Sequence, residues 1–211
     1  MTIFFVEGNI GTGKSTLLSQ IKKHDTAGRY QVIYEPVDIW TSFTDSTGSN
    51  ILEYFYKDTK RYAYAFQNLA FISRIEKIDE IDYTKEHVFI ERSVWSDSNV
   101  FARNCYEQGT LSEIEYLLYK RWFDWTTKNT NLPVDYKHIY LRCSPELSSS
   151  RMQKRGRKEE DGVSLEYTKQ IHNQHERWLK SLDGVIHVDA SVDFTNDEIF
   201  NELFEKILEK K

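Results

Sequence analysis

Short apolar runs alternate with longer segments of helical periodicity along the 211 residues of the chain. Runs rich in Ile, Val, Phe and Tyr predict strands, and apolar residues repeated every three or four positions predict helices. The predicted strands are Thr2–Glu7, Tyr30–Tyr34, His87–Glu91, Lys137–Arg142 and Gly184–Asp189. The predicted helices are Thr16–His24, Ala63–Ile78, Ile114–Trp125 and Ile199–Leu208. This alternation indicates an α/β fold, with a five-stranded parallel sheet flanked by helices on both faces.

Two polar segments interrupt this pattern. Asp38–Asn50 is rich in Gly, Ser, Thr and Asp, which predicts a surface loop. Lys154–Gly162 reads KRGRKEEDG, and its composition alone favours a solvated loop. Neither segment resembles a linker and no repeat is present, so we expect residues 1–211 to form a single domain.

Composition and charge exclude several classes of protein. The chain has 28 Lys plus Arg and 33 Asp plus Glu, for a net charge of −5. A net acidic protein is poorly suited to bind nucleic acid or an anionic membrane. The net charge does not exclude a local basic patch. No apolar run approaches the roughly 18 residues of a membrane span, and Met1–Val6 resembles a first strand more than a signal peptide. Cys105 and Cys143 belong to no metal-binding pattern, which favours reduced thiols and a cytoplasmic location.

A phosphate-binding motif follows the first predicted strand. The residues Gly8, Asn9, Ile10, Gly11, Thr12, Gly13, Lys14 and Ser15 satisfy G-x-x-x-x-G-K-[ST], and Thr16 continues into a predicted helix. Glycines let successive backbone N–H groups point inward, where they and the helix N-terminus bind phosphates. Lys14 adds a positive charge near the β- and γ-phosphates, and the Ser15 hydroxyl can ligate Mg²⁺. The motif predicts a nucleoside triphosphate site, with ATP as the expected ligand.

The end of the third predicted strand narrows the class of enzyme. A GTPase would be expected to carry an Asn-Lys-x-Asp motif, which the chain lacks. Instead of the apolar run into Asp that is typical of motor ATPases, this strand ends in Glu91, Arg92 and Ser93. At the carboxyl edge of a parallel sheet, where ligands collect, the acid can hold Mg²⁺ and the arginine can neutralise a moving phosphoryl group. The sequence therefore favours a phosphotransferase.

Several motifs in order along the chain resemble those of the deoxynucleoside kinases, the family that includes deoxycytidine and deoxyguanosine kinases. They are GNIGTGKST from Gly8, Glu35-Pro36-Val37 followed by Trp40, Gln67, Arg74, ERSVWSD at Glu91–Asp97 and RGRKEEDG at Arg155–Gly162. The resemblance covers nearly the whole chain. It implies a P-loop kinase fold with a lid at about residues 151–162. It also implies a reaction of nucleotide salvage, in which ATP and a deoxynucleoside give ADP and the 5′-monophosphate with Mg²⁺.

The resemblance also implies roles for the residues of the transfer site. Glu35 matches the catalytic base, which accepts the proton of the attacking hydroxyl. Arg92 matches the arginine that contacts the 5′-oxygen and the transferring phosphate. Lys14 completes the catalytic set, and Glu91 joins Ser15 as the magnesium-associated acid.

A second group of matches describes the nucleoside site. Gln67 matches the amide that pairs with the nucleobase, and an amide offers a donor and an acceptor side by side. Its apolar surroundings would make an unpaired amide costly. Tyr56 and Glu160 match the pair that holds the sugar 3′-hydroxyl. The expected walls of the base pocket are Trp40, Phe71 and Phe101, although core packing is the more common explanation for any single aromatic residue.

The remaining matches concern the donor side and the assembly. Arg151, Arg155 and Arg157 match the lid arginines that close over the phosphates. Asp193 and Phe194 resemble the loop that contacts the adenine of ATP. The family suggests a homodimer formed through the helices Ile114–Trp125 and Ala63–Ile78, whose apolar faces could equally belong to the core.

Two residues bear on the preferred base. Arg74 lies two helical turns after Gln67, and Asp97 follows the third strand. In the family this combination accompanies deoxycytidine and purine deoxynucleosides, whereas thymidine-preferring members carry smaller or apolar residues there. Ser98 and Asn99 depart from the Arg-Tyr of animal members. The short chain resembles a compact viral or bacterial relative without a targeting extension.

The sequence leaves two alternatives to a deoxynucleoside kinase open. A nucleoside monophosphate kinase of the thymidylate type shares a P-loop, an early Glu-Pro and a lid, but it needs an extra cationic site for the acceptor phosphate. A non-catalytic module would bind ATP only to order a partner surface, and the presence of Glu35 and Arg92 argues against it.

Overall fold

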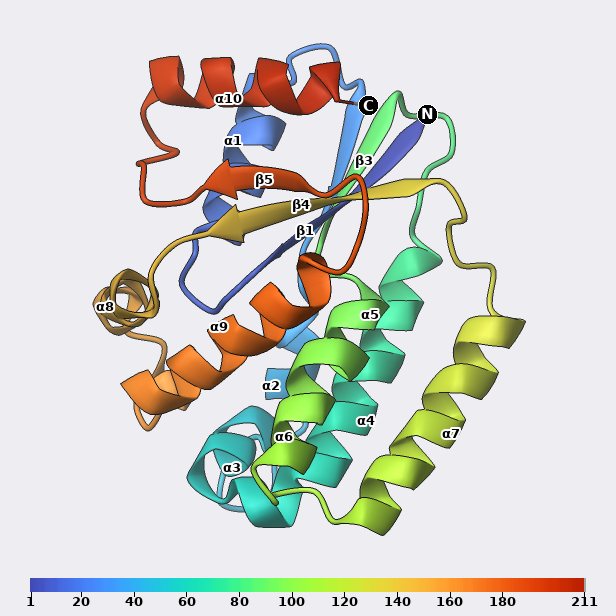
Figure 1. The fold of residues 1–211 in the computed structure, drawn as a ribbon, viewed down its shortest axis with the longest axis vertical. Helices are drawn as coiled ribbons and strands as arrows, with labels where there is room; N and C mark the ends of the chain where they lie inside the picture. The colour runs from blue at the N-terminus through green and yellow to red at the C-terminus, as the bar shows by residue number, and fades with distance from the viewer. Residues whose placement is uncertain (211) are drawn as a thin grey trace.

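The computed structural model describes residues 1–210, which form a five-stranded parallel sheet covered by helices (Figure 1). The strands are β1 (Thr2–Gly8), β2 (Tyr30–Ile33), β3 (His87–Glu91), β4 (Tyr136–Arg142) and β5 (Ile186–Asp189). The longer helices are α1 (Lys14–His24), α4 (Thr59–Ile78), α7 (Glu113–Asn129), α8 (Pro145–Arg155), α9 (Leu165–Leu179) and α10 (Asp197–Glu209). The short ones are α2 (Val37–Ser42), α3 (Ile51–Lys57), α5 (Val94–Ser96), η1 (Asp97–Ala102), α6 (Arg103–Glu107) and η2 (Lys158–Glu160).

The order of the strands brings the predicted motifs to one edge of the sheet. The order is β2-β3-β1-β4-β5, and every neighbouring pair is parallel. β1 is central, with Val6 opposite Glu91 of β3 and Gly8 opposite Leu141 of β4. The P-loop after β1 therefore lies beside the Glu91-Arg92 pair after β3, as expected where the carboxyl ends of parallel strands meet.

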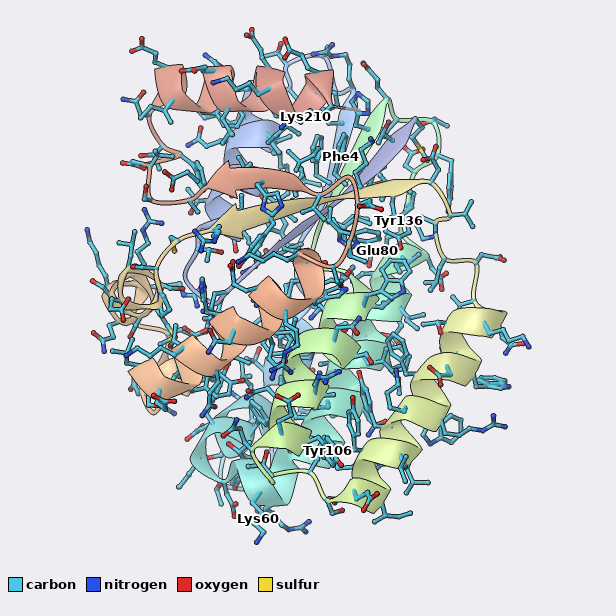
Figure 2. The ribbon with its side chains drawn as sticks, viewed as in Figure 1. Phe4, Lys60, Glu80, Tyr106, Tyr136 and Lys210 are labelled. Carbon is cyan, nitrogen blue, oxygen red and sulfur yellow. The ribbon has the colours of Figure 1, made fainter. Side chains whose placement is uncertain are left out.

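The sheet separates two layers of helices (Figure 1). Alternate residues of β1 point to opposite faces. Phe4 and Val6 pack with α1 and α10, and Figure 2 labels Phe4 between the sheet and this layer. Ile3 and Phe5 belong to the larger core on the other face, which is built with α3, α4 and α7. Both faces of the central strand are thus buried, which explains its uninterrupted apolar sequence.

Local sequence signals fix the ends of α8, which leads into the predicted lid. The Ser144 side chain accepts a hydrogen bond from the Leu147 N–H, and Pro145 occupies the first helical turn, where its missing N–H costs nothing. Gly156 ends the helix in the left-handed conformation, with φ 65°. The chain then turns into the short η2 helix, so the predicted lid is a helix end followed by a compact turn.

The predicted α/β fold with its five-stranded parallel sheet is confirmed, and the predicted strands agree with the structure to within two residues. The prediction of a loop over Asp38–Asn50 is wrong in part, because α2 covers Val37–Ser42. This helix is only six residues long and buries Trp40 alone, so it leaves no periodic pattern to detect. Across residues 1–210 no helix is both long and apolar enough to cross a bilayer.

Candidate active site

A cleft of about 820 Å³ opens at the carboxyl edge of the sheet and contains most of the predicted site residues. The predicted residues that line it are Ile10, Gly11, Gly13, Lys14, Ser15, Thr16, Glu35, Trp40, Tyr56, Gln67, Arg74, Glu91, Arg92, Asp97, Phe101, Arg151, Arg155, Arg157, Glu160, Asp193 and Phe194. They come from segments distributed along the whole chain, and the fold brings them together around one cavity.

The P-loop forms one end of the cleft. Gly11 and Gly13 have φ values of 81° and 90°, which residues with a Cβ rarely adopt. α1 begins at Lys14 without a side-chain cap, so its first N–H groups remain available to an anion. The Lys14 ammonium donates to the carbonyls of Asn9 at 2.8 Å and Gly8 at 3.3 Å. Burial and the nearby Arg92 lower the pKa of Lys14 to about 7. The negative charge of a bound polyphosphate would favour the charged form of this ammonium group.

Three P-loop residues lie behind the cleft and shape the loop. Asn9 donates through Nδ2 to the Thr168 carbonyl of α9 at 2.8 Å and accepts from the Ile10 N–H. The Thr12 hydroxyl donates to the Asn9 carbonyl at 3.0 Å. A Cβ on Gly8 would lie 2.6 Å from the Leu141 carbonyl oxygen, so only glycine fits beside β4. These contacts hold the loop in a conformation that is ready to bind phosphate.

Ser15 and Glu91 present two oxygen atoms side by side. The Ser15 hydroxyl donates to Glu91 Oε1 at 3.0 Å, and both residues line the cleft next to Lys14. Hydroxyl and carboxylate oxygens suit Mg²⁺, which takes few protein ligands when it also binds phosphates and water. In the described part of the chain no group of three or more His, Cys, Asp or Glu residues could hold a metal ion. The oxygen pair of Ser15 and Glu91 therefore fits a hard cation such as magnesium.

Glu35 lies at the centre of a network of buried charges. Its Oε1 accepts from Arg92 Nε at 3.0 Å and from Arg74 Nη2 at 3.1 Å. Arg74 also donates to both carboxylate oxygens of Asp97, through Nε at 2.8 Å and Nη2 at 3.2 Å. Burial would raise the pKa of Glu35, but the two guanidinium groups outweigh it and lower this pKa to about 2. Burial raises the pKa of Asp97, so Glu35 is the one of these two carboxylates that is held more firmly in its ionised form.

Arg92 adopts a strained backbone conformation. Its φ is 64°, and no other non-glycine residue among residues 1–210 has a positive φ. The backbone is held on both sides, because Arg92 N–H donates to the Val6 carbonyl at 3.0 Å and Ser93 N–H donates to the buried Glu7 carboxylate at 2.9 Å. Its guanidinium Nη1 donates to the Gly8 carbonyl at 2.7 Å. Residues held in sparsely populated backbone conformations concentrate at functional sites.

The other end of the cleft is apolar and contains a buried amide. Gln67 is 1% exposed, and no donor for its Oε1 is present among the described residues. Its Nε2 lies 4.0 Å from the Cys105 sulfur, which is a weak acceptor. The Trp40 ring is fixed beside it by a 2.9 Å hydrogen bond from Nε1 to the Ser73 hydroxyl. A buried amide oxygen without a partner is costly, so this end is suited to a flat ligand with a donor on its edge.

The lid segment folds back on itself through ion pairs. Arg155 donates to both oxygens of Glu160 at 2.7 and 2.6 Å, and Arg157 donates to Oε1 at 3.1 Å. Glu160 is buried and lines the cleft with Tyr56, whose pKa is raised by burial and by the Glu160 charge. Glu159 accepts from Asn50 Nδ2 at 3.0 Å, which ties the lid to the start of α3. The predicted sugar-binding pair is therefore within the same cleft, with its acid held by two lid arginines.

Arg151 occupies a different place from the other lid arginines. Its guanidinium donates to the carbonyls of Ala190, Ser191 and Val192, the residues that lead to Asp193 and Phe194. A Cβ on Gly13 would meet the Phe194 ring at 3.3 Å, so this ring lies directly against the P-loop. Arg151 lines the cleft and also holds in place the loop that is expected to contact adenine.

Two groups of residues differ from the sequence-based prediction. Phe71 does not line the cleft, because its ring packs at 5.1 Å from Phe123 of α7 and 6.1 Å from Tyr119. Phe66 of α4 lines the cleft instead. Its position directly before Gln67 is the feature of the sequence that indicates this place. His175 of α9 also contacts Arg92. The sequence does not predict this contact, because His175 is a lone histidine in an amphipathic segment.

Comparison with known proteins identifies similar sequences along the whole chain. The sequence model of the deoxynucleoside kinase family matches residues 4–210. Deoxycytidine kinase 2 of the chicken, Gallus gallus, is 35% identical over 93% of this chain and 85% of its own length. The probable deoxycytidine kinase of fowlpox virus is 34% identical over 91% of this chain and 80% of its own. The mitochondrial deoxyguanosine kinase of Xenopus laevis is 38% identical over 82% of this chain and 71% of its own.

Proposed function

Because the chain belongs to the deoxynucleoside kinase family, we propose that it transfers the γ-phosphate of ATP to the 5′-hydroxyl of a deoxynucleoside. The product is a deoxynucleoside 5′-monophosphate, which places the enzyme in nucleotide salvage. The observation that carries this proposal is a single cleft lined by both the P-loop and the buried Gln67 amide. Arg92 donates to the Gly8 carbonyl of the P-loop and to Glu35. Glu35 also accepts from Arg74, which lies on α4 with Gln67.

The residues of this cleft divide the work of the transfer. Glu35 accepts the proton as the 5′-oxygen attacks, and its ionised state at neutral pH prepares it for that role. Arg92 faces the same carboxylate and stabilises charge on the transferring phosphoryl group. Lys14 and the P-loop N–H groups bind the donor phosphates, while Arg155 and Arg157 close over them and exclude water.

Magnesium would be held by Ser15 and Glu91, whose oxygens lie 3.0 Å apart beside Lys14. Magnesium held by these two residues would supply positive charge that offsets the charge of the donor phosphates.

The base preference follows from the charged pair beside Gln67. Arg74 and Asp97 are both buried and line the cleft. Arg74 lies two helical turns from Gln67 on α4, and Asp97 of η1 accepts from its guanidinium. A charged pair complements polar base edges better than the methyl group of thymine. The relatives reported above are named deoxycytidine and deoxyguanosine kinases. We therefore propose that deoxycytidine, deoxyadenosine and deoxyguanosine are preferred to thymidine.

A kinase assay on the four deoxynucleosides tests both proposals. ADP release is followed with ATP and each nucleoside, and separately with each 5′-monophosphate. Turnover with nucleosides and none with monophosphates is expected. Turnover with monophosphates alone would identify a nucleoside monophosphate kinase, and ATP binding without turnover would identify a non-catalytic module. A higher kcat/KM for thymidine than for the other three would refute the base preference.

We also propose a homodimer formed through α7. One face of this helix exposes apolar side chains at helical spacing, whereas Tyr119 and Phe123 bury the opposite face. The exposed residues are Ile114, Leu117, Leu118, Trp122 and Trp125, each between 46% and 63% exposed. An apolar stripe of this length is unusual on a monomer and fits the same stripe of a second copy. Sedimentation equilibrium should give twice the monomer mass, and Trp122→Glu should give the monomer. A monomeric wild type would refute this.

The state of the two cysteines bears on the cellular location of the protein. Cys105 and Cys143 are free and buried, as expected for a protein of a reducing compartment. We therefore propose that the chain functions in the cytoplasm with small-molecule substrates and no nucleic-acid partner. Fractionation of cells that produce the full chain tests the location, and recovery in an organelle would contradict it.

A further inference from the structure

His175 on α9 is a fully buried titratable residue that has no role in the chemistry described above. Its Nε2 lies 3.4 Å from Nη1 of Arg92, and its Nδ1 lies 2.8 Å from the carbonyl oxygen of Ile171 one turn earlier. The imidazole is thus in direct contact with the arginine that is expected to act on the transferring phosphate.

The two contacts fix the tautomer of the ring. A carbonyl oxygen only accepts hydrogen bonds, so Nδ1 must carry the proton. In a neutral imidazole Nε2 then has a lone pair, and it accepts from the guanidinium N–H of Arg92. A protonated ring would direct a second N–H at a permanent cation, which is repulsive.

Burial and the nearby positive charges keep the ring neutral. Burial is the largest effect, and with the charge of Arg92 it lowers the pKa of His175 to about 3. The Ile171 carbonyl and the buried Glu7 act in the opposite direction, while Lys14 adds to the lowering. At any pH where the protein is expected to work, His175 is therefore an acceptor.

Two aromatic rings hold the imidazole in place. Tyr140 of β4 lies parallel to it, with 6.1 Å between centroids and 5° between planes. Phe101 of η1 meets it edge to face at 6.2 Å, and the same Phe101 ring lies 4.8 Å from the Arg92 guanidinium. Arg92 and His175 thus share one aromatic wall, so a shift of either one disturbs the other.

The helix that carries His175 is itself anchored near both ends. The next residue, Glu176, accepts from the Tyr140 hydroxyl at 2.8 Å and from Arg142 Nε at 2.8 Å. Two turns earlier, the Thr168 carbonyl accepts from the P-loop residue Asn9. α9 therefore joins β4 to the P-loop, and this gives His175 a fixed position relative to the phosphate site.

Given the kinase reaction proposed above, we propose that His175 is a positioning residue for Arg92. Arg92 Nε donates to Glu35 and Nη1 donates to the Gly8 carbonyl and to His175. No partner for Nη2 is found within residues 1–210, and Arg92 lines the cleft. By accepting on the Nη1 side, His175 prevents rotation of the guanidinium and keeps Nη2 directed at the phosphoryl group.

Substitutions separate this role from core packing. His175→Phe keeps the ring stack with Tyr140 and removes the acceptor. His175→Gln loses the ring but can place an amide oxygen near the position of Nε2. His172→Phe, one turn earlier on the same helix, is the matched control. Each variant is assayed for kcat, for KM of the nucleoside, for ATP affinity and for Tm.

The expected loss in His175→Phe is about tenfold in kcat, the value of a hydrogen bond to a charged group, with ATP affinity retained. His175→Gln should recover most of this loss despite a lower Tm, and His172→Phe should match the wild type. Activity of His175→Phe within about threefold of wild type, or equal loss in His175→Phe and His175→Gln, would overturn the proposal.

A measurement that needs no turnover covers the case in which the variants fail to fold. Imidazole ¹⁵N NMR of the wild-type protein should show the Nδ1–H tautomer, with no titration between about pH 5 and pH 8. An Nε2–H tautomer or titration in that range would refute the contact with Arg92. If the wild type phosphorylates no nucleoside, the proposed function fails, but this spectrum still reports on the contact.

Discussion

Replacing Glu35 by glutamine tests the electrostatic design of the cleft. The substitution keeps the shape of the side chain and removes the charge that faces Arg74 and Arg92. The two guanidinium groups, acting against burial, lower the pKa of Glu35 from 4.5 to about 2. This difference corresponds to roughly 3 kcal/mol of preferential stabilisation of the carboxylate in the folded state. Because the Glu35 side chain is 17% exposed, solvent screening reduces this value only moderately.

The sign of the pH dependence follows from the lowered pKa of Glu35. A carboxyl group with a lowered pKa stabilises the folded state fully above the unfolded value of 4.5, and this contribution is lost as the pH falls toward 2. Glu35→Gln should therefore lower the free energy of unfolding by about 3 kcal/mol at pH 7. The difference between wild type and variant should shrink between about pH 4.5 and pH 2.

Two measurements check this reasoning. Urea unfolding at several pH values gives the stability difference, and the kinase assay gives kcat. The general base contributes about a hundredfold or more, so kcat of Glu35→Gln should fall by at least that factor while ATP still binds. Glu202→Gln, which removes an exposed carboxylate on α10, is the control and should retain kcat. A stability difference that stays constant with pH, or kcat within tenfold of wild type, would refute the assignment.

Three further outcomes follow from the geometry. Gln67→Leu should lower kcat/KM for the nucleoside by about 10- to 100-fold, since a hydrogen-bonding residue is lost. Equilibrium binding of ATP should be unchanged. A kcat/KM equal to that of the wild type would show that the nucleobase binds elsewhere. Cys105 should react only slowly with a thiol reagent in the folded protein, because burial raises its pKa to about 12; rapid modification at neutral pH would contradict its burial. Glu7→Leu should cost about 1 to 3 kcal/mol in urea unfolding, because it leaves the buried Ser93 N–H unpaired, and a neutral effect would show that this hydrogen bond does not hold the turn after Arg92.

The elements that the sequence predicts best are those determined by residues close together in the chain. The P-loop is encoded by glycine spacing and a single lysine, and five apolar runs give the strands. The two-turn spacing of Gln67 and Arg74 also predicts a shared face of α4, and both residues line the same cleft. Because a helix turns by about 100° per residue, residues three, four or seven apart remain close.

The errors arise where a neighbouring element decides the outcome. Phe71 lies on the flank of α4 that α7 covers, whereas Phe66 and Ala70 lie on the flank that faces the cleft. Sequence alone does not say which flank α7 will take. His175 is a stronger case, because its partners Arg92, Phe101 and Tyr140 come from three separate segments. No spacing within α9 can reveal contacts of that kind.

The central position of β1 has a consequence for folding during synthesis. β1 is made before the other four strands of the sheet, yet it pairs with β3 and β4 and not with β2, which follows it in the chain. Phe4 and Phe5 are fully buried on opposite faces of the finished sheet. Until the segments of β3 and β4 emerge from the ribosome, both rings and the backbone of this strand lack their native cover. Such long-range pairing is slow and leaves apolar strands open to aggregation, so the nascent chain should depend on chaperones until β4 has been made.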